Sequence, residues 1–224
     1  MKNTIEEIFN KDFHVEVRKD LEDSVMFGMK TFGQFMIDNK NFFTYDNYGS
    51  LKGELLVYCV NKSVTDSAFT PRSLYQSRDE DVNDYGRGIV HLHTENFLTT
   101  VNRTRNRNLP GASKYRKEYA KANSGCDGQL TWGVEASKII SGVVQPQYYA
   151  ILTYGYRFDN RAKGCTHIQL LVPDENYKQV LIRKDLLDEY SKRAQLVDVS
   201  EQHERQIMAL NEGMEQLVKL KESK

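Results

Sequence analysis

The sequence predicts an α+β fold, in which a mainly antiparallel sheet is combined with N-terminal helices and a C-terminal helical extension. Three observations predict this fold class. Apolar residues recur at three- and four-residue steps from Val17 to Met36, which is the spacing of one face of a helix. Two runs rich in aromatic and branched residues, 148–158 and 166–172, have the composition of strands. Helical spacing then returns after Arg183.

The N-terminal third is predicted to be mostly helical. Thr4 followed by Glu7 forms a capping box, which predicts a short helix before the long one. Residues 42–46 are expected to form a short strand, and apolar spacing over 51–60 predicts a further helix. The polar stretch 63–84, which contains a proline and several acidic residues, is interpreted as a long loop.

The predicted sheet consists of the strands near 42, 89, 148 and 166. Residues 89–101 are expected to form one strand. Residues 148–158 and 166–172 are separated by DNRAKG, whose turn chemistry predicts an antiparallel hairpin. Because both runs are apolar at nearly every position, we expect central strands that are covered on both faces.

The last forty residues are predicted to be helical from Arg183 onward. Ile207, Leu210, Met214 and Leu217 follow a 3-4-3 spacing that resembles two heptads of a coiled-coil seam. This seam would either pair two chains into a homodimer or dock onto its own domain. The predicted organisation is therefore a single α+β domain over 1–182 and a helical extension over 183–224.

Composition indicates a cytoplasmic, intracellular protein without a membrane partner. The chain has 224 residues and no net charge, and 39% of its residues are hydrophobic, which suits an ordinary globular core. No apolar run approaches the roughly 20 residues that span a bilayer. The three cysteines form no CxxC pair, so neither a structural zinc site nor a disulfide framework is predicted.

A concentrated run of positive charge stands out in this neutral chain. Residues 103–121 hold seven Lys or Arg residues and one Glu. Its first three arginines alternate with polar residues, so an extended backbone would put them on one side. Ser113 is a good N-cap for a helix from Lys114 to about Ala122, which would gather lysines on one face. The candidate phosphate-binding side chains are Arg103, Arg105, Arg107, Lys114, Lys117 and Lys121.

These residue types suit a phosphate backbone. Arginine presents a planar fork to phosphate oxygens and lysine presents a mobile point charge. The leading hypothesis is therefore a protein that binds nucleic acid or another polyphosphate, with no cofactor and no catalysis of its own. An acidic protein partner is an alternative. The neutral net charge argues against a dedicated nonspecific DNA-binding protein.

A strand-like segment just upstream, GIVHLHTENF over 88–97, carries a different chemistry. In a strand, His91, His93 and Glu95 would project from one face. Two imidazoles and a carboxylate could bind a divalent metal, or could transfer protons during phosphoester cleavage. The alternative function is therefore a histidine-dependent or metal-dependent phosphodiesterase or nuclease. The simplest interpretation remains polar residues on an exposed strand face.

A further histidine, His167, opens the strand-like segment THIQLL. With His91, it resembles the two-histidine phosphoesterase pattern, in which each histidine lies on a strand and a hydroxyl residue follows two positions later. That resemblance implies a catalytic role for both histidines. His93 and Gln169 occupy the two hydroxyl positions here, so the residues give no family assignment. No Walker A, GxGxxG, HExxH or GxSxG motif is present.

Overall fold

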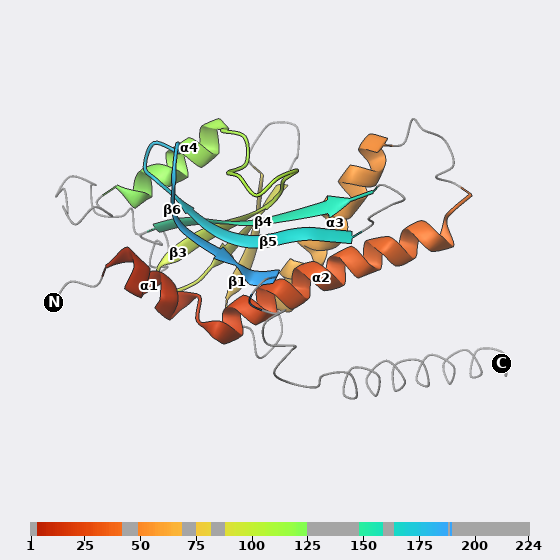
Figure 1. Ribbon diagram of the computed structural model, residues 1–224, viewed down its shortest axis with the longest axis horizontal. Helices are drawn as coiled ribbons and strands as arrows, with labels where there is room; N and C mark the ends of the chain where they lie inside the picture. The colour runs from red at the N-terminus through yellow and green to blue at the C-terminus, as the bar shows by residue number, and fades with distance from the viewer. Residues whose placement is uncertain are drawn as a thin grey trace. The chain divides into compact units, whose positions relative to one another are not determined.

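The computed structural model describes residues 4–41, 49–68, 75–81, 88–124, 148–158, 164–187 and 189. Its contacts divide the chain into a compact unit over 1–187 and a second unit over 188–224, of which only Glu189 is described. Three helices precede the sheet, and a fourth helix lies between its third and fourth strands (Figure 1). The helices are α1 (Ile5–Asp12), α2 (Val15–Asp38), α3 (Gly49–Ala68) and α4 (Lys114–Ala120).

The sheet has six strands that follow one another in chain order. They are β1 (Gln76–Asp81), β2 (Gly88–His93), β3 (Phe97–Arg103), β4 (Tyr148–Arg157), β5 (Gly164–Pro173) and β6 (Val180–Asp185). All neighbouring strands are antiparallel except β3 and β4, which run parallel. The predicted α+β class with a mainly antiparallel sheet is confirmed for the described residues. The parallel pair requires a crossover connection, and α4 lies within it.

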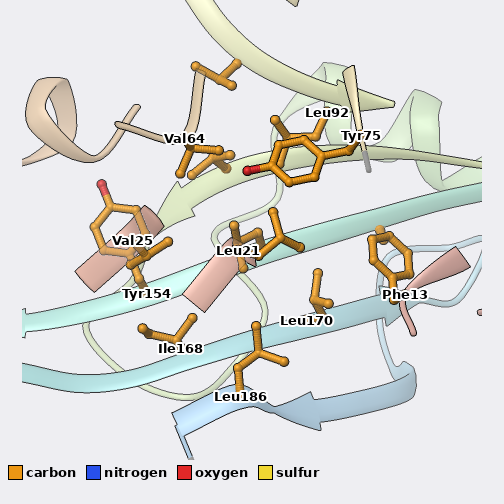
Figure 2. Packing of buried hydrophobic residues seen from close by; sticks show 14 of the residues in the cluster. Phe13, Leu21, Val25, Val64, Tyr75, Leu92, Tyr154, Ile168, Leu170 and Leu186 are labelled. Atoms are coloured by element: carbon orange, nitrogen blue, oxygen red, sulfur yellow. The ribbon is translucent and has the colours of Figure 1, made fainter. Parts of the chain in front are cut away.

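Alternate side chains of the central strands point to two different cores. On one face, Leu21 and Val25 of α2 pack with Ile168 and Leu170 of β5 (Figure 2). On the other face, the smaller core brings Ala120 of α4 together with residues of β4 and β5, namely Tyr149, Ile151 and Leu171. Strands β4 and β5 are therefore covered on both faces, as their unbroken apolar runs predicted.

Local contacts fix the start of α1, its attachment to the sheet and the packing of α2 on α3. The predicted capping box at Thr4 is confirmed, with reciprocal bonds between Thr4 and Glu7. Asp12 at the end of α1 accepts hydrogen bonds from the turn between β2 and β3, at 2.6 Å from the backbone N–H of Asn96. Helices α2 and α3 approach closely at Gly28, where a Cβ atom would lie 2.6 Å from the Cα of Val60.

Three predictions of local structure are wrong. The supposed loop over 63–84 contains the end of α3 and the whole of β1, an acidic edge strand whose polar sequence hides its strand character. The supposed single strand over 89–101 is two strands, because Thr94 donates its backbone N–H to the carbonyl of Phe97 and closes a tight turn. The supposed helix start at Arg183 belongs to β6, which pairs with β5.

The predicted boundary between 182 and 183 therefore falls inside β6. The predicted strand at 42–46 and the predicted seam from Ile207 to Leu217 lie outside the described residues. None of the helices in the described ranges is both long enough and apolar enough to cross a membrane.

Candidate anion-binding surface

The basic segment leaves the sheet at a contact between β3 and β5. Thr104, the residue after β3, lies 2.8 Å through its hydroxyl from Nε2 of His167. The imidazole reaches past β4 because Gly155 has no side chain there; a Cβ atom at Gly155 would lie only 2.5 Å from Nδ1 of His167. The hydroxyl of the adjacent Thr166 lies 3.0 Å from the same Nδ1. Both ring nitrogens are thus engaged.

The loop between β3 and α4 is held at further points. Arg107 forms an ion pair of 2.9 Å with Asp185 of β6. Asp185 also accepts a hydrogen bond of 3.1 Å from Gln169, whose side chain is buried. The hydroxyl of Tyr177 donates to the carbonyl of Pro110 at 3.1 Å. These contacts fix the path of the loop across the sheet.

Helix α4 forms over the predicted residues and has a buried side and an exposed side. A 3-10 turn, Lys121–Asn123, extends it. Ala120 is fully buried against the sheet. Arg116 bonds the carbonyl of Gly111 at 2.5 Å and also donates to the side chain of Asn102 in β3. Because Arg116 is used in this way, α4 is attached to β3 by a charged group as well as by apolar packing.

The predicted phosphate-binding residues separate into two groups. Five are exposed and belong to the loop, to α4 or to the 3-10 turn after it: Arg105, Arg107, Lys114, Lys117 and Lys121. Among them, Arg107 pairs with Asp185 and Lys121 pairs with Glu118. In the described part of the chain, no carboxylate forms an ion pair with Arg105, Lys114 or Lys117.

Arg103 does not join this exposed group. As the last residue of β3 it shares the face of Phe97 and Val101, which pack in the larger core beneath α1, α2 and α3. The neighbouring Asn102 faces α4 instead. The expectation that three alternating arginines share one side is therefore wrong, because the strand ends at Arg103 and a bent loop begins.

The histidines of β2 lie on one face of their strand, as expected. The ring centroids of His91 and His93 are 6.3 Å apart. His91 is buried, and its ring lies 5.5 Å from that of Tyr119 in α4, so this is not the exposed polar face that the simplest interpretation assumed. Glu95 lies outside the strand and forms an ion pair of 2.8 Å with Lys11 of α1.

A metal site at His91, His93 and Glu95 finds no support in this arrangement. Across the described ranges, no group of three or more His, Cys, Asp or Glu side chains is arranged to hold a metal ion. The physical reason is that β2 ends at His93, so strand alternation no longer directs Glu95 toward the imidazoles.

The sheet register also keeps His167 away from His91. His91 pairs with Thr100, whereas His167 contacts Thr104, four residues further along the chain and just past the end of β3. Four residues along a strand and three steps between strands separate the Cα atoms of the two histidines by roughly 20 Å, at ~3.3 Å per residue and ~4.8 Å per strand. A catalytic pair made from these two histidines therefore does not form on this sheet.

The electrostatics of His167 favour its neutral form. Burial lowers the pKa of His167, the nearby positive charge of Arg107 lowers it further, and Asp185 opposes the shift. Burial also raises the pKa of the neighbouring Cys165 thiol to about 11, so the thiolate is scarce at neutral pH. The Cys165 thiol is consequently not an activated nucleophile, and the neutral His167 holds the start of the loop through Thr104.

Sequence reasoning missed four residues that shape the surface. They are Thr104, Arg116, Gly155 and Asp185, which position the basic loop or α4. Arg116 could have been found, because it lies off the lysine face of the predicted helix. The other three depend on which strands are neighbours, and no local pattern encodes that information. No protein-family model, curated protein or solved structure matches the chain.

Proposed function

We propose that this protein binds nucleic acid or another polyphosphate through a basic surface formed by Arg105, Arg107, Lys114, Lys117 and Lys121. The observation that supports the proposal is a loop held in place by side chains while its cations remain exposed. Hydrogen bonds or ion pairs with other elements hold four positions, namely Thr104, Arg107, Pro110 and Arg116. Binding to such a preorganised surface avoids much of the entropy cost of ordering a flexible loop.

The pairing state of the cations also supports the proposal. Arg105, Lys114 and Lys117 are free to meet phosphates, since no described carboxylate forms an ion pair with them. In the pair Arg107–Asp185 the arginine is half exposed, whereas the Asp185 side chain is only 15% exposed. The pair Lys121–Glu118 is exposed on both sides, and exposed pairs contribute at most about 1 kcal/mol. A phosphate group could therefore compete for Lys121 at little cost.

The proposal is tested by fluorescence anisotropy with labelled duplex DNA, single-stranded DNA and RNA. Binding should weaken as salt rises from about 50 to 200 mM, because neutralised phosphates release counterions. The triple variant Arg105→Gln, Lys114→Gln, Lys117→Gln should lower the log–log salt slope by about three, which is about one for each phosphate that the variant no longer neutralises.

A matched control removes the same charge elsewhere. Lys19, Lys30 and Lys40 are exposed on or just after α2, across the sheet from α4. Their triple replacement by Gln should leave both affinity and salt slope near the wild-type values. Equal losses in the two triple variants, or no binding of the wild type to any of the three nucleic acids, would contradict the proposal. An acidic protein partner would then be the hypothesis to pursue.

A further inference from the structure

Arg103 lies in an enclosed position at the end of β3. Its guanidinium carbon is 4.9 Å from the ring centroid of Phe158, which follows β4. On the helix side, a Cβ atom at Gly53 of α3 would lie 2.7 Å from Nη1 of Arg103. The guanidinium therefore occupies space that α3 leaves open because residue 53 is glycine.

This arrangement carries two costs. Within the described ranges, no carboxylate pairs with Arg103, although the side chain is partly buried. Removing a charge from water without a partner is unfavourable. Glycine in the interior of a helix also costs about 1 kcal/mol relative to alanine. The first cost would be removed by a negative charge beside the guanidinium, and the second leaves the space that the guanidinium occupies.

A second polar group lies beside it. Tyr154 in β4 is the direct register partner of Arg103, and its side chain is fully buried within the larger core (Figure 2). Its hydroxyl has no hydrogen-bond partner among the described residues. Burial raises the pKa of Tyr154, although the charge of Arg103 opposes the shift. The phenol therefore stays protonated and can donate a hydrogen bond.

We propose that Arg103 and Tyr154 form a binding site for a small oxyanion, a phosphate or a carboxylate, next to α3 at the ends of β3 and β4. The guanidinium fork can donate to two oxygens of one anion, and the phenol can donate to an oxygen as well. Phe158 and Gly53 bound the space around the guanidinium. This site lies on the opposite face of the sheet from the basic surface, so it does not depend on nucleic-acid binding.

The experiment measures the Tm of the full chain as sodium phosphate replaces sodium chloride at constant ionic strength. Phosphate stabilises many proteins weakly because it is excluded from their surfaces, and that general effect grows without saturating. A specific site instead adds a saturable rise in Tm. We expect this saturable rise in the wild type, its loss in Arg103→Gln and a smaller rise in Tyr154→Phe.

Two further variants distinguish this site from anion binding at the basic surface and from a general change in stability. Lys117→Gln removes the same charge from the exposed surface of α4 and should respond to phosphate as the wild type does. Gly53→Ala should raise the Tm in chloride, because alanine favours the helix, yet reduce the response to phosphate by displacing the guanidinium. Tyr154→Phe removes one hydroxyl group and Gly53→Ala adds one methyl group, so these two small changes carry the test if Arg103→Gln does not fold.

A parallel titration with sodium acetate distinguishes the two oxyanions. A larger saturable response to acetate than to phosphate identifies a carboxylate site, and the reverse identifies a phosphate site. A response in Arg103→Gln equal to that of the wild type would overturn the proposal, because the anion would then bind elsewhere. The absence of a saturable response to either anion in the wild type would overturn it as well.

Discussion

Replacement of Gly155 by alanine should destabilise the protein by displacing two side chains, His167 and Thr166. A Cβ atom at this position would lie 2.5 Å from Nδ1 of His167 and even closer to Cε1 and to the hydroxyl of Thr166. The buried ring would have to move, and the hydrogen bond to Thr104 would break. Overpacking costs about 1–3 kcal/mol, and a broken hydrogen bond costs about 1 kcal/mol. The expected loss in free energy of unfolding is therefore about 3 kcal/mol.

Urea denaturation monitored by circular dichroism measures this loss as a lower midpoint at unchanged slope. Gly33→Ala in α2 is the matched control, because no atom lies within 4 Å of its added Cβ. That substitution should stabilise the helix by up to about 1 kcal/mol. The same glycine-to-alanine change thus has opposite signs at the two positions.

A double-mutant cycle tests the mechanism. In an His167→Ala background the added methyl group meets no imidazole, so the cost of Gly155→Ala should shrink by about 2 kcal/mol, a coupling typical of residues in contact. A Gly155→Ala variant as stable as the wild type would refute the reasoning. So would a cost that is the same with and without the imidazole.

Three other predictions concern separate parts of the molecule. Burial holds the pKa of His167 below its usual value of about 6.5. The unfolded chain therefore binds more protons at this residue as the pH falls. The free energy of unfolding that the neutral ring contributes is fully present above pH ~6.5 and declines as the pH falls toward the folded pKa. Urea titrations of His167→Gln should accordingly show a flatter pH dependence below about pH 6.5. Asn123→Ala should cost about 3 kcal/mol in the same assay, because its buried amide forms three hydrogen bonds, to both backbone groups of Tyr149 and to the carbonyl of Pro173. If the predicted seam at Ile207, Leu210, Met214 and Leu217 pairs two chains, sedimentation should give a dimer that Leu210→Asp converts into a folded monomer, whereas a wild-type monomer at high concentration would exclude pairing.

Periodicity predicted the elements in which the apolar pattern continues along most of their length. Helix α2 and the hairpin of β4 and β5 have long apolar patterns, and each was predicted within a few residues of its observed bounds. Prediction failed where the local signal was weak. The sequence QSRDED of β1 lacks the branched and aromatic residues typical of strands, and the Thr94 turn contains neither glycine nor proline.

The candidate surface was predictable only in its local part. Helical spacing placed Lys114 and Lys117 on an exposed face, and both are exposed. Strand alternation could also have placed Arg103 with the apolar Val101, had the end of β3 been known. The contact between Thr104 and His167 joins residues 63 positions apart and passes a glycine on a third strand. Such a contact follows from strand register, which depends on the assembled sheet.

The parallel pair at the centre of the sheet has a consequence for the order of folding. Strands β1 to β3 and strands β4 to β6 are two antiparallel meanders, and in the second of them Ile151 pairs with Leu171, only 20 positions away. Every pairing between β3 and β4 instead joins residues 51 positions apart. Closing that larger loop costs more chain entropy before any contact compensates for it. The two halves should therefore form as separate local units, and their union along β3 and β4 should be the slow step. Substitutions in the paired residues of β3 and β4 would then change the folding rate, whereas substitutions on the outer strands would mainly change the unfolding rate.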